Sequence, residues 1–315
     1  MKQLKKLPFF VVGSERSGTT MLRLMLEAHS MLAVTPEFEF ATYPIRQGRP
    51  FPDSDALEDL TRNWIFRSLK IDYFCLDSWP KAMQNIMEIY GNKNNSTVTG
   101  AVVHKDYEEL PRIFPQAKYI HIIRDPRDVA YSVVKMGWAS DVVTGVNRWF
   151  EAEKSWDILK QSLDSSMVLE VHFEELVDHP DKTLAMICDF LDVPYVSQML
   201  KYDQSSSYDK PNRAIAQAWR QRLSEKEIGT LEYILGNKLE ARGYKNSGLK
   251  QRRPSFVYLK LLPLFDWIAR FRHRRKMYGI LLLIEDYFAR KTRFSKSLTE
   301  RLQQRMEAIW ISNLK

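Results

Sequence analysis

Cysteine is nearly absent from this sequence of 315 residues, in which Cys75 and Cys188 are the only two. They lie far apart in the chain and match no metal-ligand spacing, so we expect neither a disulfide framework nor a cysteine-type metal site. The histidines form no ligand spacing with carboxylates or cysteines either. We therefore expect reduced thiols, a cytoplasmic location and no bound metal.

Long hydrophobic runs are also missing. No apolar run reaches the roughly 20 uncharged residues that a bilayer-spanning helix needs. The run at Leu7–Val12 follows a basic start but is too short for the core of a signal peptide. Internal repeats and low-complexity tracts are absent as well, and the length favours one main domain with a modest appendage.

The formal net charge of +8 is spread unevenly along the chain. Residues 1–249 hold 31 Lys or Arg and 34 Asp or Glu, whereas residues 250–315 hold 16 and five. Because the basic excess belongs to the tail, the net charge does not indicate nucleic-acid binding by the main domain. We place a domain boundary after residue 249, with a basic, helical extension at 250–315.

Short apolar runs alternate with helical patterns, which predicts a parallel α/β sheet. The predicted strands are Phe9–Val12, Thr99–Val103, Tyr119–Ile123 and Met167–Val171. The predicted helices are Thr19–Ala28, Asp128–Lys135, Thr144–Leu163, Lys182–Leu191 and Ser224–Arg242. The proline-punctuated segment from Tyr43 to Asn95 is less regular, and we interpret it as an inserted region on the substrate side.

What the chain does contain is a phosphate-binding loop with one residue replaced. A strand runs into a loop bounded by Gly13 and Gly18 and then into a helix, so backbone N–H groups and the helix dipole would face an anion. The glycine spacing is that of a nucleotide P-loop, but Thr19 stands where ATP and GTP enzymes carry a lysine for the phosphates. Arg16 is the only cation in the loop.

A second anion site is predicted after the strand at 119–123. Arg124 would lie at the carboxyl end of that strand, Pro126 would begin the next helix, and Ser132 would lie about two turns along it. Arg124 and Ser132 could then bind one phosphate group. A surface ion network among the Arg and Asp side chains of residues 124–128 is the alternative, and the lysine-free phosphate loop favours the phosphate site.

Together these motifs resemble sulfotransferases that use 3′-phosphoadenosine 5′-phosphosulfate (PAPS), most closely bacterial sulfotransferases akin to tyrosylprotein sulfotransferases. The resemblance covers about residues 7–245 and is strongest at 8–40, 102–136 and 168–194. It implies a P-loop-type α/β fold of three layers, with a central parallel sheet flanked by helices, followed here by the C-terminal helical extension. It also implies transfer of a sulfuryl group from PAPS to a hydroxyl or amine without a metal, leaving 3′-phosphoadenosine 5′-phosphate (PAP).

The resemblance carries over to the donor site residue by residue. The residues that would hold PAPS are Arg16, Ser17, Gly18, Thr19, Thr20, Arg124, Ser132, Phe173, Arg213 and Arg220. The first five would bind the 5′-phosphosulfate, Arg124 and Ser132 the 3′-phosphate, and Phe173 the adenine. Arg213 and Arg220 would belong to a basic segment that closes over the 3′-phosphate, although the glycines often seen there are absent and Trp219 could simply anchor the segment.

The resemblance also implies the catalytic residues. Glu37 falls where the family carries the carboxylate that removes the acceptor's proton, with Glu39 as the alternative. Arg16 and Lys105 would stabilise the negative charge that develops on the bridging and 5′-phosphate oxygens. A histidine acts as the base in soluble small-molecule sulfotransferases, but for His104 we expect a structural role.

Two other functions and several acceptors stay open at this point. A P-loop small-molecule kinase would need a phosphate lysine and a metal carboxylate, which are missing at the expected positions. A non-catalytic module at a membrane surface would use the tail, where apolar runs at 256–271 and 278–284 flank basic residues 272–276. The tail could instead pack on the core or on a second subunit. The acceptor could be a small molecule, a glycan, a lipid or a peptide.

Overall fold

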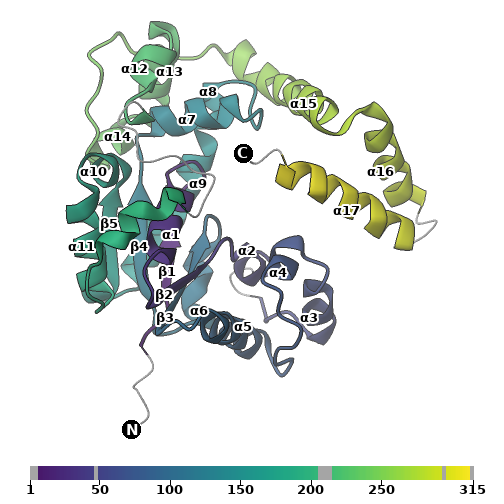
Figure 1. Ribbon diagram of the computed structural model, residues 1–315. Helices are drawn as coiled ribbons and strands as arrows, with labels where there is room; N and C mark the ends of the chain where they lie inside the picture. Colours follow the sequence, from purple (N-terminus) through teal and green to yellow (C-terminus); the bar gives the residue numbers. More distant parts are fainter. Residues whose placement is uncertain (1–5, 46–48, 205–214, 293–295, 313–315) are drawn as a thin grey trace. The chain divides into compact units, whose positions relative to one another are not determined.

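The computed structural model describes residues 6–45, 49–204, 215–292 and 296–312. They form two compact units, shown in Figure 1. The first comprises Met1–Val129 and Asn147–Arg220, and the second Ala130–Val146 and Gln221–Lys315. The structure thus groups residues 221–249 with the tail and not, as the predicted boundary at 249 has it, with the sheet.

The first unit is built on a five-stranded parallel sheet with the order β2-β3-β1-β4-β5. The strands are β1 (Phe9–Val12), β2 (Leu32–Thr35), β3 (Val98–Val103), β4 (Lys118–Ile123) and β5 (Val168–His172). The four predicted strands are confirmed, and β2 was not predicted. Because the chain leaves β1 for β2 and β3 on one side and then crosses to β4 on the other, the carboxyl end of β1 is a switch point, where open α/β sheets bind ligands.

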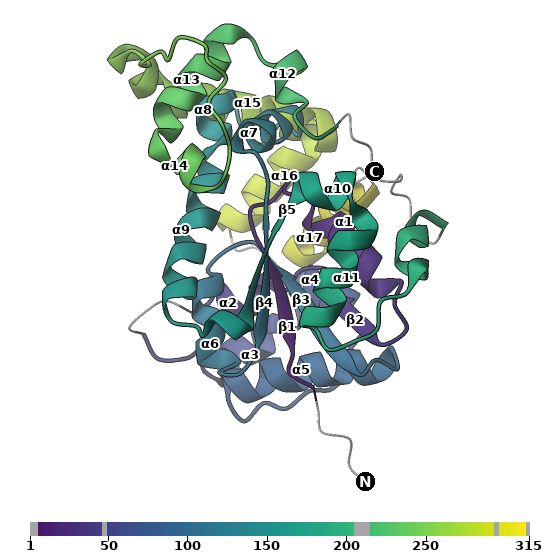
Figure 2. The same cartoon turned by 90° about the vertical axis from the view of Figure 1, so that its left-hand side faces the viewer.

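Side chains of the central strand alternate between two hydrophobic cores. Phe9 and Val11 face a core shared with helices α1 and α11, whereas Phe10 and Val12 face one shared with α5 and α9. Figure 2 shows α1 and α11 on one side of the strands and α9 on the other. These are the three layers of the predicted P-loop-type fold. The helices and turns of this unit are α1 (Thr19–Glu27), α2 (Glu39–Thr42), α3 (Ser54–Leu60), α4 (Trp64–Ser68), α5 (Trp79–Lys93), η1 (Tyr107–Glu109), α6 (Leu110–Ile113), α9 (Asn147–Gln161), η2 (Ser165–Met167), α10 (Phe173–Asp178), α11 (Pro180–Phe190) and η3 (Ser197–Gln204).

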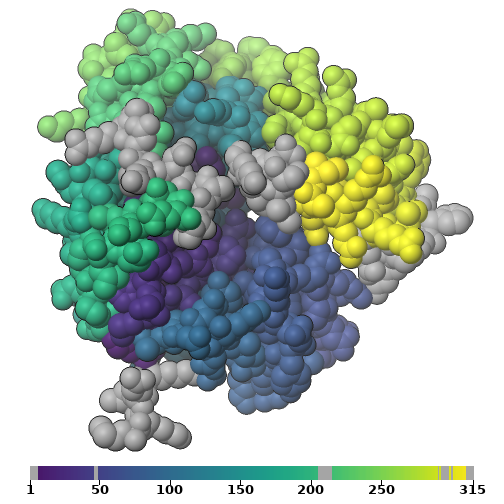
Figure 3. All heavy atoms as spheres, in the orientation of Figure 1, coloured from purple at the N-terminus to yellow at the C-terminus, as the bar shows by residue number. Residues whose placement is uncertain are grey.

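The segment that the sequence left irregular is mostly helical, and Figure 3 shows it in blue. Asp53 caps α3 by accepting from the backbone N–H of Ala56 at 3.1 Å, and Asn63 caps α4 in the same way. Pro80 lies in the first turn of α5, where a missing N–H costs nothing. Asp53, Asn63 and Pro80 thus mark the starts of helices in this segment.

The second unit is helical. Its elements are α8 (Val142–Gly145), α13 (Glu225–Leu235), α14 (Asn237–Ala241), α15 (Phe256–Tyr278), α16 (Ile280–Thr292) and α17 (Lys296–Ser312), while α7 (Pro126–Lys135) and α12 (Trp219–Arg222) continue into it from the first unit. Ser224 and Glu227 form a capping box at the start of α13, and Gly236, with φ of 51°, divides the helix predicted at Ser224–Arg242 into α13 and α14. Among the described helices, none is sufficiently long and hydrophobic for a transmembrane span.

The structure also shows the surroundings of several individual side chains of the first unit. Both cysteines are free thiols, as predicted. Trp149 and Trp156 on α9 are fully buried. The His104 ring lies 3.1 Å from the Gly13 carbonyl oxygen through Nδ1, in keeping with the structural role expected of it.

Candidate active site

The loop between β1 and α1 has the conformation of an anion cradle. Gly13, Arg16 and Gly18 all have positive φ, of 151°, 70° and 92°. A Cβ on Gly18 would lie 2.3 Å from the Phe173 ring, and one on Gly13 would lie 2.4 Å from the carbonyl oxygen of Ile122, so neither position tolerates a side chain. Gly18 precedes α1 without a side-chain cap, which leaves the first N–H groups of that helix available to an anion.

Two side chains of the loop are buried at this helix start. Ser17 and Thr19 are 1% and 3% exposed. The Ser17 hydroxyl has no hydrogen-bond partner among the described residues. A buried hydroxyl without a partner costs free energy, and a bound anion would supply the missing acceptor.

Arg124, at the carboxyl end of β4, is fixed against the same loop. Its Nη1 donates to the carbonyl oxygen of Arg16 at 2.9 Å and its Nη2 to that of Ile215 at 2.7 Å. Its Nε is buried and has no partner within the described part of the chain. Burial lowers the pKa of the guanidinium, and neighbouring carboxylates oppose that shift. A half-buried guanidinium with a buried, unpartnered N–H beside a phosphate loop fits an anionic ligand.

Phe173 supports both the loop and Arg124. Its ring touches Gly18 and lies 4.3 Å from the Arg124 guanidinium carbon, Cζ. Only 2% of the residue is exposed. The ring packs against the loop in this structure, and its contact with adenine stays a prediction.

The alternative of a surface ion network at residues 124–128 does not describe this structure, because the network is buried. Arg127 donates two side-chain hydrogen bonds to Asp125, and both residues are 2% exposed. The Arg127 guanidinium stacks 3.7 Å from the ring of Trp219, whose backbone N–H donates to Asp128 at 2.8 Å. Trp219 thus anchors its segment beside the end of β4. Burial raises the pKa of Asp128 to about 6, against the opposing charge of Arg124.

The two candidate carboxylates follow β2 and differ in their surroundings. Glu39 Oε1 accepts the backbone N–H of His104 at 2.8 Å, so this side chain holds the end of β3. Glu37 is half-buried. Burial and the charge of Glu39 raise the pKa of Glu37, while His104 and Arg23 act in the opposite sense. A carboxylate with a raised pKa is suited to proton abstraction.

Lys105 follows β3 and faces the phosphate loop through an ion pair. Its Nζ lies 3.8 Å from Oε1 of Glu15, a residue of that loop, and its side chain is 46% exposed. Glu15 also pairs with Arg148, which lies at the start of α9. Sequence reasoning missed both Glu15 and Arg148. The only signal for Arg148 is that a helix start near the carboxyl edge of a parallel sheet can reach the same site.

The structure says less about the remaining residues that are predicted to bind PAPS. Ser132 lies on α7, which passes from the first unit into the second. Arg220 is exposed, and its Nε donates to Gln217 at 3.0 Å while its guanidinium lies 4.4 Å from the Trp219 ring. Thr20 lies half-buried in the first turn of α1. Arg213 lies outside the described residues.

Comparison with known proteins identifies the family of this chain. A model of the sulfotransferase family matches residues 8–197. Protein-tyrosine sulfotransferase A of Caenorhabditis elegans is 26% identical over 214 residues, and protein-tyrosine sulfotransferase 1 of Danio rerio is 27% identical over 212. Each alignment covers 62% of this chain and 53% or 56% of the relative, so the chain spans about half the length of these curated relatives.

Two solved structures share the fold. The sulfotransferase domain from the curacin biosynthetic pathway matches with a TM-score of 0.55 at 18% identity, covering 78% of this chain and 99% of that domain. The sulfotransferase domain of the Synechococcus PCC 7002 olefin synthase matches with a TM-score of 0.51 at 24% identity, covering 70% and 90%. The family model spans more than half of the chain and contains the loop, Glu37, Lys105 and Arg124, so this chain belongs to the sulfotransferase family.

Proposed function

We propose that this protein transfers a sulfuryl group from PAPS to an acceptor hydroxyl or amine. The observation that carries the proposal is an anion cradle with unsatisfied donors. The buried Ser17 hydroxyl and Arg124 Nε both lack partners among the described residues, and Arg124 is hydrogen-bonded to the loop that contains Ser17. Thr19 in place of a P-loop lysine favours a phosphosulfate over the triphosphate of ATP.

Donor binding would use residues 16–20 for the 5′-phosphosulfate and the pair Arg124 and Ser132 for the 3′-phosphate. Backbone N–H groups at the start of α1 supply neutral donors, and Arg16 adds a cation from within the loop. We assign Phe173 to holding Gly18 and Arg124 in place. Arg213 and Arg220 would add charge from the segment before and after Trp219.

The chemistry requires a base on one side of the sulfur and positive charge on the other. The acceptor oxygen or nitrogen attacks sulfur, its proton passes to the Glu37 carboxylate, and the bond from sulfur to the bridging oxygen breaks. The electron pair goes to the 5′-phosphate of PAP, where Arg16 and Lys105 stabilise it. Glu39 is the weaker candidate for the base because one of its oxygens already accepts the His104 N–H.

The names of the relatives suggest an acceptor to test first. Both relatives compared above are called protein-tyrosine sulfotransferases. We therefore propose a phenolic hydroxyl, such as that of a peptide tyrosine, as the first acceptor class to assay. A base with a raised pKa would assist its deprotonation during attack.

Calorimetric titration with PAP and with ATP, each with and without Mg²⁺, tests the donor assignment. We expect PAP to bind more tightly than ATP and Mg²⁺ to leave PAP binding unchanged. Ser17→Ala should weaken PAP binding by about tenfold without lowering the thermal midpoint, because the hydroxyl has no partner to lose. Ser14→Ala is the matched control, since its hydroxyl bonds within the loop to the carbonyl of Glu15. Tighter binding of ATP than of PAP would refute the proposal.

A further inference from the structure

Helices α15 and α16 of the second unit expose large apolar side chains. Leu281 is 73% exposed, Trp267 65%, Phe288 55% and Leu264 52%. Trp267 on α15 and Phe288 on α16 line the same groove, so these two side chains belong to one apolar surface and are not isolated positions. Contiguous apolar patches of this kind on a protein surface usually mark a binding site.

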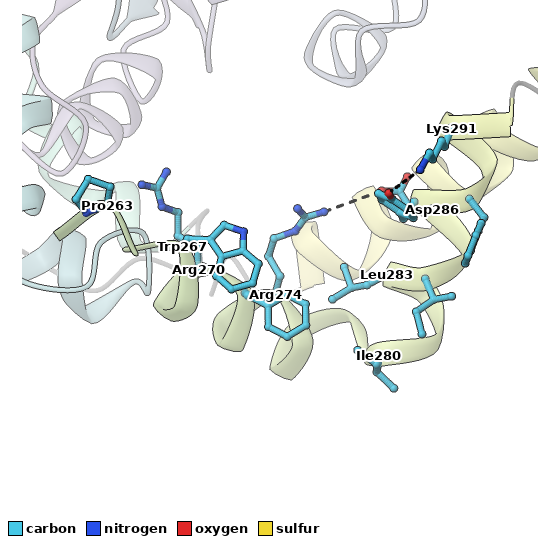
Figure 4. A pocket seen from close by; sticks show the side chains of 12 residues that line it. Pro263, Trp267, Arg270, Arg274, Ile280, Leu283, Asp286 and Lys291 are labelled. Atoms are coloured by element: carbon cyan, nitrogen blue, oxygen red, sulfur yellow. Dashed lines mark hydrogen bonds and ion pairs between the residues drawn. The ribbon is translucent and has the colours of Figure 1, made fainter. Parts of the chain in front are cut away.

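A groove lies between the two helices, with a volume of about 1070 Å³. Figure 4 shows Trp267 on α15 and Ile280 and Leu283 on α16 along it. The Trp267 and Phe271 rings stack with their centroids 5.9 Å apart. Cationic side chains line the same groove: Arg270, Arg274 and Lys291. The groove thus combines an apolar lining with positive charge.

The surface is also strongly basic. Arg272, Arg275 and Lys276 at the end of α15 are exposed, and no carboxylate pairs with them among the described residues. The wider region 250–315 holds 16 Lys or Arg against five Asp or Glu. Arg270 and Arg274 have carboxylate partners, at 2.5 Å in Asp266 and 4.0 Å in Asp286, which leaves the end of α15 as the unneutralised part.

We propose that α15 and α16 dock on the surface of an anionic phospholipid bilayer. Exposed Trp, Phe and Leu side chains would enter the boundary between headgroups and acyl chains, and the arginines and lysines would bind the phosphates. Charge complementarity selects this occupant over a second copy of the chain, because two copies of one basic surface repel each other. This docking is independent of the proposed sulfuryl transfer.

Co-sedimentation of the full chain with vesicles tests the proposal. We expect recovery with phosphatidylglycerol-containing vesicles, little recovery with pure phosphatidylcholine vesicles, and a decrease as salt is raised. Arg272→Gln combined with Arg275→Gln and Lys276→Gln should lower the partition coefficient by about fivefold per charge removed, which corresponds to about 1 kcal/mol each. Trp267→Ala should weaken binding at high salt, where the apolar contribution dominates.

The matched control removes the same charge elsewhere. Lys154, Lys182 and Lys201 are exposed side chains of the first unit, and a triple change of these to Gln should leave vesicle binding unchanged. Equal loss in the two triple variants would mean that only net charge matters and would overturn the docking surface. Equal recovery with anionic and neutral vesicles would overturn it as well. A dimer in sedimentation velocity that Trp267→Ala dissociates, without vesicle binding, would assign the surface to a second copy.

Discussion

The arginine side chains near the carboxyl ends of the strands differ in burial and in hydrogen bonding from those of the C-terminal helices. Arg124 is half-buried and Arg127 is buried, and hydrogen bonds to backbone carbonyls or to Asp125 fix their guanidinium groups. Arg272 and Arg275 are exposed on a helix whose neighbouring side chains include exposed Trp and Phe. A fixed guanidinium can recognise one phosphate group in one geometry, whereas mobile surface arginines recognise the charge density of an extended anion.

The comparison also shows what net charge can and cannot indicate. The chain carries +8, yet residues 1–249, with the predicted anion sites, hold more acidic than basic side chains. The proposed anion recognition at the sheet would depend on backbone N–H groups and on a few arginine side chains. The amino-acid composition therefore indicates that the tail is basic, but it does not indicate the predicted anion sites near the sheet.

The largest expected effect belongs to Glu37, which would separate catalysis from donor binding. Glu37→Gln should lower kcat by about 100-fold to 10,000-fold and leave PAP affinity nearly unchanged, because only the base is lost. Since the pKa of Glu37 is raised, kcat/KM should fall as the pH drops through a value above the ordinary range of a glutamate. A PAP-release assay measures both effects. If Glu39→Gln abolished turnover and Glu37→Gln did not, the assignment of the base would pass to Glu39.

Gly18→Ala should have the second largest effect, on the stability of the protein and on PAP binding. The new Cβ would overlap the Phe173 ring at a residue with φ of 92°, so we expect a loss of about 2–5 kcal/mol in the free energy of unfolding and no measurable PAP binding. Gly248→Ala is the control, because its φ is 83° but nothing lies within 4 Å. It should cost about 1 kcal/mol through backbone strain alone. Urea denaturation of both variants would show whether the overlap matters.

Asp128 offers a smaller, pH-dependent effect. Because its folded pKa of about 6 lies above the unfolded value, the stability it contributes is present below about pH 4 and is lost as the pH rises through about 6. Asp128→Asn stays neutral and can still accept the Trp219 N–H. Its unfolding free energy relative to the parent protein should increase by about 1 kcal/mol between about pH 5 and about pH 7.5. Asp189→Asn, at an exposed position, should show no such trend.

Glu15→Gln should have the smallest effect and would test whether the loop carboxylate restrains nearby cations. Its charge pairs with Lys105 and Arg148, so neutralising it should free both for an anionic ligand. We expect PAP to bind about two- to fivefold more tightly, a modest gain because these pairs are partly exposed and screened. Calorimetry at two salt concentrations is the measurement. Weaker PAP binding would mean that the pairs position Lys105 and Arg148 for the ligand.

The sequence predicted the sheet and the loop because their signals are local. Phe9–Val12 followed by Gly13 and Gly18 specifies a buried strand and a cradle within a dozen residues. β2 was not predicted because its sequence, Leu-Ala-Val-Thr, is less apolar than the Phe-Phe-Val-Val of β1, which has the same length. The helices at 54–93 were not predicted because their starts are marked only by single caps, such as Asp53 and Asn63, in a segment that four prolines interrupt.

Pairings between distant segments could not be predicted in the same way. Glu15 and Arg148 are brought together only because β1 and α9 meet at one edge of the sheet, and neither residue type indicates the other in the sequence. The difference between the surroundings of Glu37 and Glu39 could not be predicted either. It depends on the backbone N–H of His104, which a sequence pattern does not place. The packing of Phe173 against Gly18 is a further contact between distant segments that the sequence did not indicate.

Arg124 has one further consequence, which concerns thermodynamic linkage. Its two hydrogen bonds join the phosphate loop, through Arg16, to the segment at Ile215, which lies 91 residues further along the chain. A ligand that orders the loop therefore also protects this segment, and anything that orders the segment must tighten ligand binding by the same factor. In hydrogen exchange, the amides around residues 215–219 should slow when PAP binds.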